Sequence, residues 1–136
     1  MDSISLKVPV TVKAKLTEKL RTKMRKEMEE GVSRAELELQ QIGIQEKRVM
    51  QEAEQGELTP QAIDHINMIR QERQSRMEYV EQTRAHLEEL EKIAEGAEII
   101  QGTLEHQVEV HVGDDMREIM NVEILVEDDK IIAIRS

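Results

Sequence analysis

The sequence predicts an α+β fold in which a long antiparallel helical hairpin, a coiled coil, carries a small antiparallel β head formed by the N-terminal strand and the C-terminal strands. Three observations predict it. Apolar and polar residues alternate at both ends of the chain, apolar residues recur at heptad spacing through the middle, and one strong turn signal divides the middle in two. We expect the β head to comprise residues 1–15 and 97–136 and the hairpin residues 16–96, with its turn near residues 55–60.

The N-terminal segment is predicted to be a strand because every second residue from Ile4 to Val12 is apolar. A single strand cannot satisfy its own backbone, and the residues that follow it have helical spacing. Its partner must therefore come from the other end of the chain. Pro9 has no backbone donor, so we expect this strand to lie at a sheet edge, or to turn Pro9 away from its neighbour.

The first helix is predicted to begin at Thr17, which is a suitable N-cap, and to continue to about Gln55. Apolar residues recur every seven positions along it and form a seam with one polar interruption at Glu46. The seam comprises Met28, Val32, Ala35, Leu39, Ile42, Glu46, Val49 and Ala53. Gly31 lies within this pattern, beside a Ser-x-x-Glu capping box at Ser33, so the sequence allows either a bend there or a continuous helix.

The second helix is predicted to follow a turn at Gly56, because glycine is favoured just after a helix and Pro60 is suited to the start of the next. It should continue to about Glu95, with an apolar seam that is interrupted by Arg73 and Arg76. We expect these two arginines to extend outward and to weaken the contact between the helices.

Two helices of similar length joined by a short turn fold back on each other, so the numbers of facing residues should sum to about 116. Ala35 should then face Val80, and the basic stretch 18–27 should lie beside the acidic stretch 89–98. We expect much of the basic stretch to be neutralised in this way, and we favour this interpretation over a nucleic-acid-binding patch.

The period of two returns after Gly96 and predicts the rest of the β head. The expected elements are a strand over 104–112, a short helical turn or loop over 116–120, and strands over 122–126 and 131–135. Gly113 should end the first of these strands, and Asp128 with Asp129 should form a tight turn between the last two. Asp-Gly would be more usual at such a turn, so the sequence leaves its type open.

The composition limits the chemistry. The chain has 136 residues, a net charge of −10, no cysteine, and Tyr79 as its single aromatic residue. The lack of cysteine excludes disulfides, thiolate catalysis and zinc–thiolate sites. The sequence has no signal-peptide pattern, no apolar run long enough for a membrane span, no glycine-rich phosphate loop and no nucleophile motif. It therefore predicts a cytoplasmic protein with no membrane attachment, cofactor, metal site or catalytic residue.

Two groups of residues are candidates for external contacts. Lysines on the first strand and just after it can contact the phosphates of RNA: Lys7, Lys13, Lys15 and Lys19. Acids around the hairpin turn can contact a protein partner, or reach a metal in a partner enzyme as do the transcript-cleavage factors that enter RNA polymerase: Glu52, Glu54, Glu57 and Asp64. An exposed turn in an acidic chain is also commonly acidic without any function.

The segments KVPVTVKAKLTEKLR, QVEVHVGDD and VEILVEDDKIIAIRS, together with the long hairpin rich in Glu, Lys and Gln, resemble the YlqD family of bacterial proteins. The resemblance covers essentially the whole chain, and its motifs are strand and turn patterns. It therefore implies no catalytic residue. Because members tend to be encoded beside genes for ribosome maturation and tRNA modification, the resemblance implies a role near RNA or the ribosome.

We therefore expect a non-enzymatic binding or scaffold protein of unknown process, which uses its helical arm and β head for contacts with a protein partner and for self-association into a homo-oligomer. A head of roughly fifty residues has a marginal core by itself, and exposed strand edges favour a second copy. Two alternatives stay open. One is an RNA- or ribosome-associated accessory factor, and the other is an acidic-tipped hairpin that acts on an RNA polymerase or a similar partner.

Overall fold

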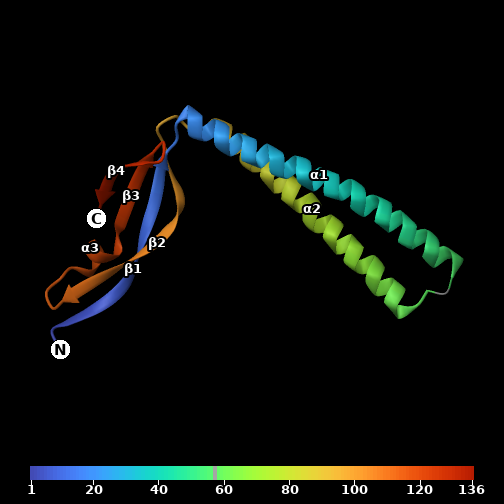
Figure 1. Ribbon diagram of the computed structural model, residues 1–136, viewed down its shortest axis with the longest axis horizontal. Coiled ribbons are helices and arrows are strands. Elements are labelled where there is room, and N and C mark those ends of the chain that lie inside the picture. Colours follow the sequence, from blue (N-terminus) through green and yellow to red (C-terminus); the bar gives the residue numbers. More distant parts are fainter. Residues whose placement is uncertain (57) are drawn as a thin grey trace. The chain divides into compact units, whose positions relative to one another are not determined.

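The computed structural model describes residues 1–56 and 58–136. In chain order its elements are β1 (Ser3–Lys15), α1 (Glu18–Gln55), α2 (Pro60–Lys92), β2 (Glu98–His111), α3 (Met116–Met120), β3 (Val122–Glu127) and β4 (Lys130–Arg135) (Figure 1). The chain divides into two compact units, one formed by Met1–Thr22 with Ile93–Ser136 and the other by Lys23–Lys92. The predicted α+β class, a helical hairpin with a sheet drawn from both chain ends, is confirmed.

The first unit contains a four-stranded sheet in the order β2-β1-β3-β4. β1 pairs with β2 in the antiparallel direction, as predicted, with Val10 opposite Leu104. β3 and β4 are also antiparallel, but β1 and β3 are parallel, so the head is mixed and not antiparallel throughout. The cause lies in the connection through α3, which takes the chain from β2 to the far side of β1 and starts β3 in the direction of β1.

Of the two arrangements expected for β1, the sheet-edge position is wrong, because β1 lies between β2 and β3. The ladder between β1 and β3 begins at Val10, however, so Pro9 precedes the doubly paired part of β1. Pro9 has a strand neighbour only in β2, where it lies opposite Glu105. A proline is tolerated there because just one of its two sides faces another strand.

The ends of β1 and β2 are joined by backbone hydrogen bonds where the chain leaves and re-enters the sheet. The Leu16 amide donates to the Ala97 carbonyl, and the Gly96 amide donates to the Leu16 carbonyl, both at 2.8 Å. The Leu16 side chain is fully buried at this point. The Thr17 hydroxyl then donates to Asp128 Oδ1 at 2.7 Å, so the start of α1 is tied to the turn between β3 and β4.

That turn has positive φ at both central residues, +47° at Asp128 and +69° at Asp129. Positive φ at both positions is the property of a type I′ turn, whose twist matches the twist of the two strands it joins. The sequence placed the turn correctly and left its type open, and the structure supplies the type.

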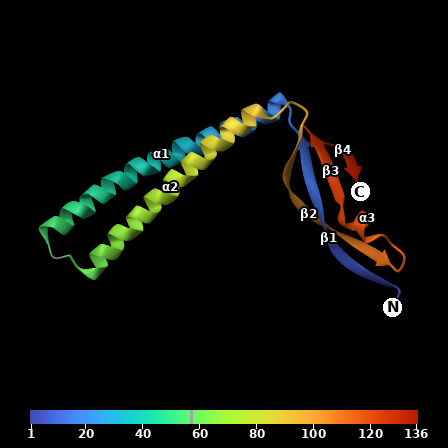
Figure 2. The same ribbon diagram turned by 180° about the vertical axis from the view of Figure 1, so that it is seen from behind.

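The helices of the second unit form the predicted antiparallel pair, with α1 and α2 side by side in both ribbon views (Figure 2). The Leu20 amide donates to the Thr17 hydroxyl at 3.1 Å, which confirms the predicted N-cap of α1. The Ala62 amide donates to the Thr59 hydroxyl at the same distance and caps α2. α1 is continuous through Gly31, so of the two alternatives the helix without a break is observed.

The predicted register between the helices is confirmed by their core, in which Ala35 packs with Val80 and Val32, and Leu39 packs against this cluster. Val80 and Ala35 are buried, as are Ile42, Ile66 and Ile69 nearer the turn. Within the described residues, neither long helix is apolar enough over a sufficient length to cross a membrane.

Candidate functional site

The lysines of β1 lie on the polar face of the sheet, where acidic residues accompany each of them. Lys13 Nζ is 2.7 Å from a carboxylate oxygen of Glu123 on β3. Lys15 lies opposite Glu98 on β2, and Lys7 lies opposite Gln107, between the positions of Glu105 and Glu109. These acids lower the positive potential that a phosphate would meet on this face.

Lys19, the fourth predicted phosphate contact, is exposed in the first turn of α1. Near it, Arg21 does not contribute to a basic surface, because its side chain is buried. One guanidinium nitrogen of Arg21 donates to the Ile93 carbonyl at 2.7 Å, and Nε donates to Glu18. The predicted neutralisation of the basic stretch is seen at Arg25, whose Nε lies 2.6 Å from Glu91.

Glu98 was expected beside the basic stretch and instead belongs to an ion-pair network on the polar face of the sheet. Arg135 contacts Glu98 at 2.6 Å and Glu123 at 2.8 Å, and Glu123 also contacts Lys13. The hydrogen bond from Arg135 holds the pKa of Glu98 below its usual value, and the hydrogen bond from Lys13 does the same for the pKa of Glu123. The network connects both edge strands, β2 and β4, across the polar face.

The structure describes three of the four acids predicted at the hairpin tip. Glu52, Glu54 and Asp64 are exposed, and Glu57 lies outside the described residues. Of the three described acids, Glu54 alone lines the cavity of about 280 Å³ found at the tip, which is otherwise largely apolar. Its lining residues are Met50, Ala53, Glu54, Leu58, Ile63, Ile66, Asn67 and Arg70. Among the described residues, no group of three or more acids and histidines has the geometry to hold a metal ion.

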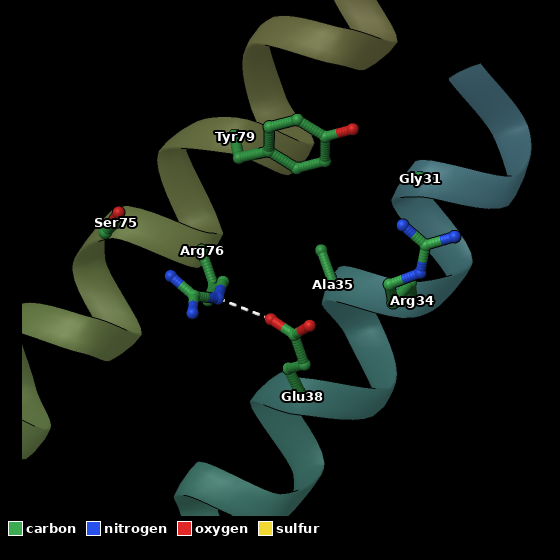
Figure 3. A pocket seen from close by; sticks show the side chains of 7 residues that line it. All are labelled: Gly31, Arg34, Ala35, Glu38, Ser75, Arg76 and Tyr79. Carbon is green, nitrogen blue, oxygen red and sulfur yellow. Dashed lines mark hydrogen bonds and ion pairs between the residues drawn. The ribbon is translucent and has the colours of Figure 1, made fainter. Parts of the chain in front are cut away.

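A second cavity, of about 350 Å³, lies on the hairpin between Gly31 and Tyr79. Figure 3 shows the Tyr79 ring extending from α2 toward the backbone of α1 at Gly31, above the ion pair between Arg76 and Glu38. A Cβ at position 31 would meet the Tyr79 hydroxyl in close contact. The glycine therefore makes room for the single aromatic side chain of the protein.

The interruptions of the two helical seams meet each other, which sequence reasoning missed. Glu46 of α1 forms a hydrogen bond of 2.6 Å with Arg73 of α2, and Arg70 lies 4.0 Å from the same carboxylate. Arg76 pairs with Glu38. The expectation that Arg73 and Arg76 extend outward is therefore wrong, because both reach across and bind acids of α1. That they weaken the contact between the helices stays a prediction.

The face of the sheet opposite the ion-pair network is a largely apolar surface of the first unit. The cross-strand register places three apolar rows on it. One row comprises Ile99, Ala14, Val126 and Ile131, the next Gly102, Val12, Ile124 and Ile134, and the third Leu104, Val10 and Val122. We call this surface the apolar sheet face.

Exposure across the apolar sheet face rises from its centre to its edges. Val10 on the central strand is 4% exposed, whereas Leu104 on β2 is 58% exposed and Ile134 on β4 is 71% exposed. At the other end of the same face, α3 contributes Met116 and Ile119 to a cavity of about 280 Å³ that Ile4 and Val110 also line. The three rows lie beyond that cavity. The pairing has an irregularity in each of two ladders, so Ile99 and Gly102 of β2 share this face although they are three residues apart, as do Ile131 and Ile134 of β4. Strict alternation in the sequence would place these residues on opposite faces, so only the observed register assembles the rows.

Comparison with families of known proteins identifies the chain. The model of the YlqD protein family matches residues 4–135, nearly the whole length. The chain belongs to the YlqD family. Among solved structures, this YlqD-family chain is similar to a protein of unknown function from Synechococcus sp. WH 8102, with 26% identity, a TM-score of 0.81 and full coverage of both chains. A comparison with curated proteins gives no match.

Proposed function

We propose that this YlqD-family protein is a non-enzymatic binding or scaffold protein of the cytoplasm, which associates with itself and presents its helical hairpin to a protein partner. The observation that carries the proposal is the apolar sheet face, where the large side chains Leu104, Ile131 and Ile134 are exposed. Contiguous exposed apolar patches on a folded domain commonly mark a contact with another macromolecule.

The polar face of the sheet favours protein contacts over RNA contacts. Lys13 is held by Glu123, and the other two lysines of β1 lie among acids of β2. A phosphate backbone would have to displace Lys13 from Glu123, and it would approach Lys7 and Lys15 against the negative charge of the acids on β2. Cosedimentation with ribosomal subunits at low and at high salt tests the RNA alternative, because binding through phosphates weakens steeply as salt rises. Salt-sensitive cosedimentation that Lys7→Glu and Lys15→Glu abolish would support RNA binding against our proposal.

Sedimentation velocity of the wild-type chain tests the proposed self-association. We expect the average mass to rise from that of a monomer toward that of a dimer between about 1 µM and about 300 µM. A single species of monomer mass over this whole range would contradict it.

A further inference from the structure

The apolar sheet face carries no ionisable side chain in any of its three rows. The rest of the molecule is strongly charged: the chain has a net charge of −10, and the opposite face of the sheet holds Lys13, Glu98, Glu123 and Arg135. Two copies of so acidic a chain repel each other over most of their surfaces. Because the three rows hold no charged side chain, two copies can pack through them without removing a charge from water.

The middle row also has a protruding residue at one edge and a space at the other. Ile134 on β4 is the most exposed side chain of the row, whereas Gly102 on β2 has no side chain. A Cβ built at Gly102 would meet no atom within 4 Å, so the space beside it is open. Both residues align with Val12 and Ile124, at the same level along the strands.

A two-fold axis parallel to the strands fits these features. Such an axis keeps each row at its own level and reverses the strand order, so β4 of one copy lies over β2 of the other. From this complementarity we propose that two copies of the chain pack face to face through the three rows, with Ile134 of each copy seated beside Gly102 of the other. The inference rests on the proposed self-association and assigns to it a surface and a geometry.

The arrangement matches the known packing of two sheets whose strands are aligned, about 10 Å apart. Every contact then occurs twice, as in other isologous dimers. The rows span up to four strands and about five residues along β1, which corresponds to roughly 19 Å by 17 Å at ordinary strand spacings. This is roughly 320 Å² on each copy, well below the about 800 Å² per partner of a standard interface, so the dimer is expected to be weak and to dissociate in the micromolar range.

Gly102→Val is the decisive substitution, because a Cβ at position 102 meets no atom within 4 Å in its own copy. The φ of Gly102 lies outside the left-handed region, and valine is favoured in strands, so the fold and its thermal midpoint are expected to be kept. In the dimer the same side chain occupies the space that Ile134 needs. Sedimentation velocity should show a dissociation constant raised about tenfold or more.

Two further variants examine the same pair of positions. Ile134→Lys should also leave a folded monomer, because it places a charge in the apolar contact. Gly102→Val combined with Ile134→Ala should recover part of the lost affinity, since the shortened side chain leaves room for the valine. Such a recovery of affinity requires that position 102 of one copy contacts position 134 of the other. If the variants only reduced the apolar surface, the double variant would bind no better than Gly102→Val alone.

Two control variants are placed on α1. Gly43→Ala fills another glycine whose Cβ meets no atom, and Leu37→Lys charges an exposed leucine of the hairpin. Both should dimerise as the wild type does. Wild-type dimerisation that Gly102→Val leaves unchanged would overturn the inference, and loss of the dimer in Leu37→Lys would place the contact on the hairpin. Either result would retain the proposed self-association, whereas a wild type that stays monomeric would remove both.

Discussion

The hydroxyl of Tyr79 on α2 occupies the space that a Cβ at position 31 of α1 would need, and this contact couples the single aromatic residue of the chain to a glycine inside a helix. Glycine within a helix costs about 1 kcal/mol relative to alanine. The contact with Tyr79 offsets part of that cost, which gives a physical reason for glycine at a position where the sequence allowed either a bend or a continuous helix.

Gly31→Ala should therefore have an effect that depends on Tyr79. In the wild-type background, Gly31→Ala should leave the free energy of unfolding unchanged or lower it. The alanine favours the helix, but its Cβ displaces the side chain of Tyr79, and the two effects oppose each other. In a Tyr79→Ala background the same change should stabilise by about 1 kcal/mol. Urea unfolding followed by helical circular dichroism measures both, and equal effects in the two backgrounds would show that the residues are not coupled.

The pair formed by Glu46 and Arg73 should matter more than the exposed pairs of the hairpin. Arg73→Ala leaves the half-buried carboxylate of Glu46 with a weaker partner, so we expect a loss of about 1–2 kcal/mol. Replacing both residues by leucine continues the two apolar seams and should restore or exceed the wild-type stability.

Arg84 and Glu36 provide the matched control, because this pair also crosses the hairpin but is more exposed. Arg84→Ala should cost less than about 0.5 kcal/mol. If Arg84→Ala and Arg73→Ala had the same effect on the urea midpoint, the partial burial of Glu46 would not be the deciding factor.

The turn between β3 and β4 holds two aspartates at positive φ, which side chains other than those of glycine adopt at a cost. Asp129→Gly should raise the free energy of unfolding by about 0.5–1 kcal/mol, since glycine adopts this conformation readily. Asp128→Gly relieves the same kind of strain but removes the acceptor of the Thr17 hydroxyl, so it should give a smaller gain or none. A larger gain from Asp128→Gly in thermal unfolding would indicate that the Thr17 contact adds no stability.

The ion-pair network of Arg135 predicts a pH dependence with a defined sign. The pKa values of Glu98 and Glu123 are lower in the folded protein than in the unfolded chain, where they lie near 4.5. The contribution of these two carboxylates to the free energy of unfolding is therefore complete above pH 4.5, and it is lost as the pH falls through the lower pKa values of the folded protein. Arg135→Gln should reduce the urea midpoint at pH 7, and its difference from the wild type should shrink below pH 4.5.

The wild type and Arg135→Gln must be compared with each other, because the other carboxylates of this acidic chain also take up protons as the pH falls below about 4.5. Subtracting one curve from the other removes the contribution of carboxylates far from Arg135. A difference that stayed constant from pH 7 to below pH 4 would mean that the network does not couple folding to protonation.

Local signals in the sequence determined where most elements begin and end. Thr17 caps α1, Thr59 and Pro60 start α2, and the two aspartates make the last turn, because each signal involves residues a few positions apart. The register of the hairpin followed from the same kind of information, since a short turn leaves little freedom in how two helices face each other.

Only the tertiary structure decided the contacts between distant segments. The position of β1 inside the sheet depends on which side of it the connection through α3 takes β3, and no pattern within a single strand records that choice. The pairs Gly31 with Tyr79 and Glu46 with Arg73, and the row that holds both Gly102 and Ile134, exist only once the chain has folded. The sequence by itself thus determined the elements, their periods and the hairpin, whereas strand order decided the surface on which the proposed function rests, because that order is set by interactions between residues far apart in the chain.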